Sequence, residues 1–203
     1  MLTFDPVLHR YAIDGVVLPS VTQILQACGC YDFSMVPRDV LEHKREIGKA
    51  LHLAVALDID NDLVEESVHP EVLGYLRSWR SFRADLGLTD ADFGYIEQPL
   101  AHHTYRFAGT PDMTLFMEKA WGVLDLHTAA DLHPAWALQT AAYKELVNTN
   151  AKKGQSKVQR RWALRLAENG TYKLDEHQDR SDLAIFLAMY SVRQWCAANL
   201  KGA

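Results

Sequence analysis

Cysteine is scarce in this sequence, and the few cysteines have no paired spacing. Cys28, Cys30 and Cys196 are the three in 203 residues. An odd number of this kind argues against a disulfide framework and is typical of a reducing compartment. A zinc or iron–sulfur centre takes four ligands, so we expect no such centre at Cys28 and Cys30.

Long apolar runs are also missing. No stretch reaches 18 apolar residues, the length that a transmembrane helix requires. The N-terminal residues, MLTFDPVLHRY, do not combine a basic segment with a following apolar one, so we expect no signal peptide. The sequence therefore predicts a cytoplasmic protein without a membrane partner.

The sequence has no excess of positive charge. Its 21 Lys and Arg residues are outnumbered by 26 Asp and Glu residues, which gives a formal net charge of −5. Any binding to a polyanion must therefore come from local basic patches, or from metal ions that offset acidic groups. Apolar residues make up 48% and charged residues 23% of the chain, as in ordinary globular proteins. This length suits a single domain, which we place at residues 1–203.

The apolar pattern alternates between helical and strand periodicity. Residues 1–35 are expected to form an N-terminal hairpin, turning at Asp14-Gly15, and a short helix capped by Ser20. Residues 93–175 are expected to form the sheet, with one helix inserted. The individual strands are expected over residues 93–100, 104–117, 121–128 and 158–174, and the last of these ranges is a hairpin that turns at Asn169-Gly170. The longer helices are expected over residues 37–57, 70–87, 134–148 and 180–200. These elements predict a mixed α+β fold, a central sheet of three to five strands flanked by helices.

The most informative stretch is residues 109–129, GTPDMTLFMEKAWGVLDLHTA. If it forms a hairpin that turns at Glu118-Lys119, then Asp112 and Asp125 lie equally far from the turn and face each other across the strands. Their Cβ atoms would be roughly 5 Å apart. Two carboxylates at that distance repel each other unless one is protonated or a cation lies between them. A divalent ion with oxygen ligands is the simplest solution.

Strand alternation places a histidine beside this pair. Val123, Asp125 and His127 share one face of the expected strand, whereas the intervening leucines point the other way. Polar groups on a buried strand need a reason, because such strands are normally apolar. The alternative is that Asp112 belongs to a turn after Pro111 and that Asp125 pairs with an arginine.

Two other segments offer polar residues for the same site. Gln139 and Tyr143 are four residues apart on the next expected helix, so a helix docked against the strands would aim both at the carboxylates. His52 lies in the last third of the helix over residues 37–57. The alternative for each is a structural role: a buried tyrosine with a polar neighbour, and a histidine of the core or the surface.

Taken in order along the chain, these motifs resemble those of the PD-(D/E)xK nuclease superfamily, in particular its RecB-like and phage exonuclease branch. GKALH, residues 48–52, is similar to the helical histidine motif, and GTPD, residues 109–112, to the strand of the first aspartate. DLH, residues 125–127, stands where the family has D-x-K, and QTAAY, residues 139–143, matches the Q-x-x-x-Y motif. The opening residues 9–25 are similar to the N-termini of phage-encoded members.

This resemblance implies a restriction-endonuclease-like fold and a nuclease, in the first place an exonuclease, that hydrolyses DNA phosphodiesters with Mg²⁺ or Mn²⁺. Asp112 and Asp125 would bind the metal directly, with the backbone carbonyl of Leu126 as a further ligand. His52 would be another ligand or an orienting group. Glu97, which we place on the preceding strand, would be an outer-sphere ligand; its alternative is an exposed carboxylate at a strand end.

The same resemblance implies roles for the following helix and for partners. Gln139 and Tyr143 would position the motif strand or contact a DNA phosphate. The partner would be DNA, and a homo-oligomer or a recombination partner protein would fit as well. The protein would belong to a bacterial cytoplasm or be encoded by a phage.

The sequence departs from the family pattern at His127, where these nucleases carry lysine. Lysine would supply a fixed positive charge to the phosphate and help to orient the attacking water, whereas histidine is only partly charged near neutrality. Next to two carboxylates it would stay protonated and act as a weaker substitute. Beside a bound dication it would be neutral and could ligate the metal, which would favour Mn²⁺ or another transition metal over Mg²⁺. The chain is therefore a working variant, an impaired or non-catalytic member, or the product of a deliberate lysine substitution.

A basic run, KKGQSKVQRR at residues 152–161, contains five basic residues and no acidic one. Backbone phosphates are natural partners for such a run, although a solvated loop is the alternative. The predicted DNA contacts are Lys152, Lys153, Lys157, Arg160 and Arg161. A second basic surface is expected on the helix over residues 37–57, formed by Arg38, Lys44, Arg45 and Lys49.

Two other functions stay open. One is a catalytically inactive DNA-binding or protein-binding module on the same fold, which His127 favours. The other is a zinc hydrolase that uses some of the nine histidines. The sequence has no HExxH motif, and His43 and His52 are nine residues apart and would point in different directions on a helix.

Overall fold

The computed structural model describes residues 1–129 and 131–200, that is, the predicted domain except for residues 130 and 201–203. The helices are α1 (Val21–Ala27), α2 (Arg38–Ile59), α3 (Pro70–Asp85), α4 (Ala135–Asn150) and α5 (Asp182–Asn199), with short 3-10 turns at Glu65–Ser67 and Asp90–Asp92. The strands are β1 (Leu2–Asp5), β2 (Arg10–Ile13), β3 (Val16–Leu18), β4 (Phe93–Gly94), β5 (Leu100–His102), β6 (Phe107–Gly109), β7 (Met113–Met117), β8 (Ala120–His127), β9 (Arg160–Leu166) and β10 (Tyr172–Glu176). None of the helices in the described part of the chain has both the length and the hydropathy that crossing a membrane requires.

A five-stranded mixed sheet, in the order β10-β9-β8-β7-β4, forms the centre of the fold. β7 and β8 form one antiparallel hairpin, β9 and β10 form another, and β4 pairs antiparallel with β7. β8 and β9 run parallel, and α4 makes the crossover that a parallel pair requires. The predicted mixed α+β class, with a central sheet flanked by helices, is confirmed.

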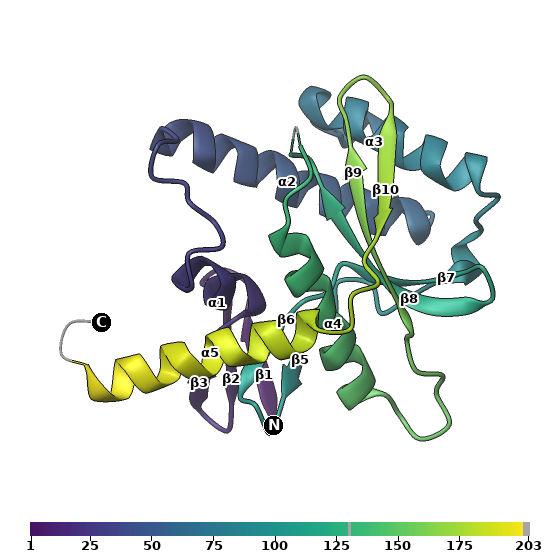
Figure 1. Cartoon of the computed structure of the whole chain (residues 1–203). Helices are drawn as coiled ribbons and strands as arrows, with labels where there is room; N and C mark the ends of the chain where they lie inside the picture. Colours follow the sequence, from purple (N-terminus) through teal and green to yellow (C-terminus); the bar gives the residue numbers. More distant parts are fainter. Residues whose placement is uncertain (130, 201–203) are drawn as a thin grey trace.

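Helices cover both faces of this sheet, each over its own apolar core. α2 and α3 pack on one face, against Leu124 and Leu126 of β8. On the other face, α1, α4 and α5 pack around Val123 of the same strand. Figure 1 shows α2 and α3 together on one side of the strands and α5 on the other. The predicted alternation of β8 is therefore correct, and Asp125 and His127 share the face that α4 covers.

Two smaller strand groups lie at the edge of the domain. β1, β2 and β3 form an antiparallel sheet, and β5 pairs with β6. They share a third apolar cluster that includes Tyr11 of β2 and Ala108 of β6, and one parallel bridge joins Ser20 to Ala108. Tyr11 Oη also lies 2.8 Å from Thr110 Oγ1. The N-terminal sheet is thereby held against the start of the β7–β8 hairpin.

Local signals in the sequence identified the turns and the cap correctly. Asp14 and Gly15, between β2 and β3, both have positive φ angles, 51° and 80°. Ser20 caps α1: its Oγ accepts from the Gln23 N–H at 3.1 Å, and the Gln23 side chain accepts from the Ser20 N–H at 2.9 Å. The hairpin of β9 and β10 turns at Asn169-Gly170, as predicted.

Two of the expected strands are wrong in part. Within residues 93–100, the strand ends at Gly94, because Tyr95 and Glu97 take left-handed backbone conformations (φ 46° and 48°) that a strand does not tolerate. Within residues 104–117, the chain forms two strands instead of one. β6 leaves the main sheet to pair with β5, and only β7 pairs with β8. Apolar alternation runs through both strands, so it does not reveal the break.

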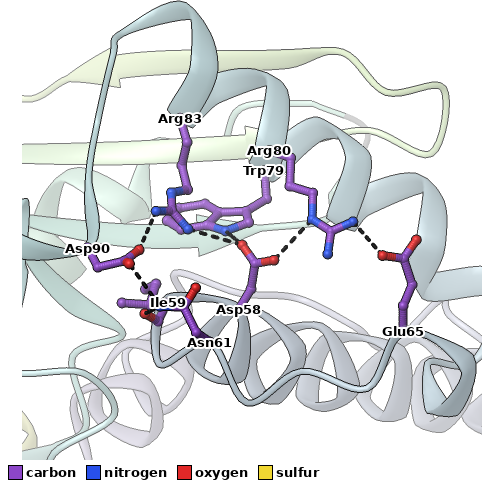
Figure 2. A network of polar contacts seen from close by, with 8 residues as sticks. All are labelled: Asp58, Ile59, Asn61, Glu65, Trp79, Arg80, Arg83 and Asp90. Carbon is purple, nitrogen blue, oxygen red and sulfur yellow. Dashed lines mark hydrogen bonds and ion pairs between the residues drawn. The ribbon is translucent and has the colours of Figure 1, made fainter.

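A largely buried carboxylate joins α2 to α3 (Figure 2). Asp58, near the end of α2, accepts hydrogen bonds from Trp79 Nε1 at 3.0 Å, Arg80 Nε at 3.0 Å and an Arg83 guanidinium nitrogen at 3.2 Å. Its side chain is only 11% exposed. Loss of this carboxylate would leave three donors of α3 without their acceptor, so the network stabilises the helix pair. α2 is the helix that carries His52.

Candidate metal centre

One cavity, with a volume of about 650 Å³, contains the residues predicted for catalysis and metal binding. It lies where α2, the β7–β8 hairpin and α4 meet, and the N-terminal sheet forms part of its rim. The predicted residues that line it are His52, Glu97, Asp112, Asp125, Leu126, His127, Gln139 and Tyr143. Residues from separate parts of the sequence therefore converge on one space.

The two aspartates face each other, as predicted. Glu118 and Lys119 form the turn, with φ angles of 51° and 65°, and the β7–β8 register extends by one residue to place Asp112 opposite Asp125. Both side chains are buried. Asp112 Oδ2 accepts a hydrogen bond from the backbone N–H of Leu126 at 2.6 Å. Leu126 thus contacts the pair through its backbone, while its carbonyl as a metal ligand stays a prediction.

His52 and Glu97 form a compact group with Asp112. His52 Nδ1 lies 3.2 Å from Asp112 Oδ1 and 3.1 Å from Glu97 Oε1, and the ligand atoms of the three residues are all within 4.8 Å of one another. Glu97 is not on a strand, contrary to our expectation. It lies in the left-handed segment after β4, where its backbone N–H donates to the Asp112 carbonyl at 2.8 Å. The departure from strand geometry is what brings its carboxylate to the site.

Burial makes the negative charge of this group costly. It raises the pKa of Asp112 and brings the pKa of Asp125 to about 7. Burial alone would lower the pKa of His52, but the carboxylates of Asp112 and Glu97 raise that pKa well above its usual value, so the ring is protonated while no metal is bound. The single positive charge of His52 thus faces three carboxyl groups, those of Glu97, Asp112 and Asp125. A divalent cation among them would offset the remaining negative charge.

His127 joins this group through Asp125. Its ring stacks face to face on Trp136 of α4, with ring centroids 3.7 Å apart and planes 2° from parallel. His127 Nε2 lies 3.0 Å from Asp125 Oδ2 without the geometry of a hydrogen bond, and both atoms are buried with no hydrogen-bond partner among the described residues. Burial lowers the pKa of His127 to about 3. Of the two protonation states considered for this histidine, the structure favours the neutral ring.

Gln139 and Tyr143 of α4 face the cavity, as predicted. Tyr31 donates its O–H to Gln139 Oε1 at 2.7 Å, so the amide nitrogen is the part of Gln139 that is left to donate within the cavity. Tyr143 packs on Gly109, where an added Cβ would lie only 2.8 Å from Tyr143 Cε1. The glycine of the GTPD motif thus allows α4 to approach β6. Burial keeps the pKa of Tyr143 well above its usual value, so its hydroxyl stays neutral.

Three further residues contribute to the site without having been assigned a role there. Tyr11 and Tyr31 act through tertiary contacts, with Thr110 and with Gln139, and no local sequence pattern signals such contacts. Lys49 lines the cavity. It precedes His52 by three residues on α2, and this spacing does predict that both lie on one face of the helix.

The predicted DNA-binding run divides into two parts. Its exposed part consists of Lys152, Lys153 and Lys157, in the loop between α4 and β9. Arg160 instead forms ion pairs with Glu118 and Glu176. Arg161 is buried, and its guanidinium donates to Asp182 Oδ2 at 2.7 Å and to two backbone carbonyls. The prediction of Arg161 as a phosphate contact is corrected, because its guanidinium is buried against Asp182, whereas a phosphate contact of Arg160 stays a prediction.

Comparison with known proteins identifies no family. No family model matches the chain, and no curated protein matches it. Membership of the PD-(D/E)xK superfamily therefore stays a prediction that rests on the motifs and on the geometry of this site.

The raised pKa of Asp125 predicts an effect on stability that needs no knowledge of the reaction. The pKa of an unfolded aspartate is about 3.9, whereas that of folded Asp125 is about 7. The folded state therefore disfavours the ionised form, and stability is lost as the pH rises through this window. With a metal chelator present, Asp125→Asn should raise the free energy of unfolding by about 1–2 kcal/mol at pH 8 and change it little at pH 4.

Urea unfolding of both proteins at the two pH values measures this difference. The matched control is Asp62→Asn, an exposed position outside the cavity, which should change the free energy of unfolding by less than about 0.5 kcal/mol at either pH. A loss of stability in Asp125→Asn at pH 8 would contradict the account of a buried, repelled carboxylate.

Proposed function

We propose that this chain is a divalent-metal-dependent nuclease of the PD-(D/E)xK type that hydrolyses phosphodiester bonds in DNA. The observation that carries the proposal is the convergence of Asp112, Asp125, Glu97 and His52 on one cavity. These side chains fit a divalent ion, because three are oxygen donors, their summed charge is negative, and the buried Oδ2 atom of Asp125 has no hydrogen-bond partner.

The arrangement of the fold supports the same proposal. A β-hairpin presents the two aspartates, and the helix that follows it, α4, carries Gln139 and Tyr143 to the same cavity. α4 then leads to a strand parallel to β8. This order of elements agrees with the order of motifs on which the family resemblance rests, and it is compatible with a restriction-endonuclease-like core.

A divalent ion at this centre would polarise a phosphoryl oxygen and lower the pKa of the attacking water. The side chains would hold and orient the reacting groups. The Gln139 side chain, whose amide oxygen accepts from Tyr31, would donate from its amide nitrogen to a phosphate oxygen. Lys49 adds a cation to the cavity that the neutral His127 does not provide, and such fixed charges stabilise the negative charge that develops on the phosphate.

The exposed lysine loop is adjacent to the segment that carries Glu97. Tyr95 donates its O–H to Gln155 Oε1 at 2.8 Å, and the backbone N–H of Lys152 donates to the same oxygen at 3.1 Å. Tyr95 precedes Glu97 by two residues. A DNA backbone that contacts Lys152 and its neighbours would therefore lead toward the cavity, and the contacts would be independent of base sequence.

A second candidate is a catalytically inactive DNA-binding or protein-binding module on the same fold. The observation in its favour is His127, a neutral and buried ring where the family carries a charged lysine. Such a module would keep the lysine loop and bind DNA, but it would show no metal-stimulated cleavage.

The active-site prediction is tested by cleavage of end-labelled linear DNA in Mn²⁺ and in Mg²⁺. Asp112→Asn and Asp125→Asn should each lower the rate by at least about 100-fold, because each removes a charge that holds the metal. Asp62→Asn serves as the control and should cleave at the wild-type rate. Equal cleavage by all four proteins would place the reaction elsewhere, whereas DNA binding without cleavage by the wild type would favour the inactive module.

The predicted DNA-binding loop is tested by a triple variant in which Lys152, Lys153 and Lys157 are each replaced by glutamine. DNA affinity at low salt should fall, and the slope of log affinity against log salt should flatten by up to about 2–3, close to one unit for each lost phosphate contact. A control with the same change in charge replaces Arg77, Lys119 and Lys173, which are exposed and lie outside the cavity. If both triple variants change the slope equally, the lysine loop has no special part in binding.

A further inference from the structure

We propose that His127 is itself a metal ligand, and that the centre therefore prefers a divalent transition ion such as Mn²⁺ over Mg²⁺. This inference rests on the metal centre of the proposed function and names the ion that it takes. In the family that the motifs resemble, the lysine at this position supplies a fixed positive charge. His127 would instead coordinate the metal.

Two buried polar atoms without a hydrogen-bond partner lie next to each other at this position. His127 Nε2 and Asp125 Oδ2 are 3.0 Å apart, both are buried, and neither has a hydrogen-bond partner among the described residues. Burial of two such atoms without a partner is costly. A cation that binds both would remove the cost for each at once.

Stacking on Trp136 fixes the orientation of the His127 imidazole. Its ring lies flat on Trp136, with 3.7 Å between the ring centroids and 2° between the planes. Trp136 is itself buried in the first turn of α4, and the Thr140 hydroxyl donates to its backbone carbonyl at 2.8 Å. In the tautomer with its proton on Nδ1, the ring therefore directs the Nε2 lone pair toward Asp125.

The spacing of the two atoms matches an octahedral ion. Ligands at about 2.1 Å on neighbouring octahedral positions are separated by about 3.0 Å, because their bonds are at right angles. Neighbouring ligands of a tetrahedral zinc ion at the same bond length would be about 3.4 Å apart. The observed 3.0 Å between His127 Nε2 and Asp125 Oδ2 agrees with the octahedral case.

The donor set selects the class of ion. His52 Nδ1 stands 3.2 Å from Asp112 Oδ1 and 3.1 Å from Glu97 Oε1, spacings that also suit neighbouring octahedral ligands. A metal that displaces the proton of His52 would take its Nδ1 as one nitrogen ligand, and His127 Nε2, beside Asp125, would be the second. Mg²⁺ prefers oxygen ligands, whereas Mn²⁺ and the later divalent ions accept imidazole nitrogen, so a site with two imidazoles favours the latter.

Calorimetric titration of the full chain with Mn²⁺ alone and with Mg²⁺ alone tests the selectivity. His127→Phe keeps a flat ring on Trp136 but removes the nitrogen, and it should weaken Mn²⁺ binding by at least about tenfold while leaving Mg²⁺ binding within about threefold. His127→Lys should likewise lower the ratio of Mn²⁺ affinity to Mg²⁺ affinity. His103→Phe, an exposed histidine outside the cavity, is the matched control and should bind both ions like the wild type.

Pulsed electron paramagnetic resonance of the Mn²⁺-loaded protein tests the bond itself. His52→Gln leaves His127 as the one expected nitrogen ligand, so its spectrum should retain a ¹⁴N coupling. The double variant His52→Gln with His127→Phe should lose that coupling. The measurement on His52→Gln requires no change at position 127, so it stays informative even if His127→Phe does not fold.

The outcomes separate this inference from the proposed function. If the wild type binds neither Mn²⁺ nor Mg²⁺, the metal centre of the proposed function is refuted, and the inference with it. If the wild type binds both ions with similar affinity, or if His52→Gln binds Mn²⁺ without ¹⁴N coupling, the inference is overturned while the metal centre stands.

Discussion

The burial of Asp112 opposite Asp125 is the constraint to which the rest of the site responds. Away from water, two facing carboxylates repel each other and lose their hydration. The Leu126 N–H and the His52 ring supply partial compensation, and α2, fastened to α3 through Asp58, holds that ring in place. The negative charge that is left uncompensated favours binding of a cation. The same charge lowers the stability of the metal-free fold, a trade-off common at functional sites.

The parts of the site that follow a strict period could be predicted from the sequence. The hairpin register followed from one turn position, because a two-residue turn at Glu118 and Lys119 fixes which residues of β7 and β8 face each other. Gln139 and Tyr143 followed from the helical period. Glu97 was assigned to a strand wrongly, since the left-handed conformations that bring it to the site occur at non-glycine residues and have no sequence signal. Arg161 was assigned to DNA because its partner, Asp182, comes from a distant helix.

Position 127 separates this chain from the family that its motifs resemble. A lysine at this place would carry its charge on a long side chain. The histidine is neutral, fixed by Trp136, and placed beside the unpartnered oxygen of Asp125. Positive charge at the centre must then come from Lys49 and a bound ion, or from His52 while no ion has displaced its proton. The substitution therefore changes how the charge is supplied and leaves the hairpin that presents the aspartates intact.

A crystal of the full chain soaked in Mn²⁺ would show whether Asp112 and Asp125 bind one ion between them. We expect an anomalous peak about 2–2.3 Å from a carboxylate oxygen of each residue. Saturating Mn²⁺ with no peak at this position, and with His52 Nδ1 still bridging Asp112 and Glu97, would contradict this expectation.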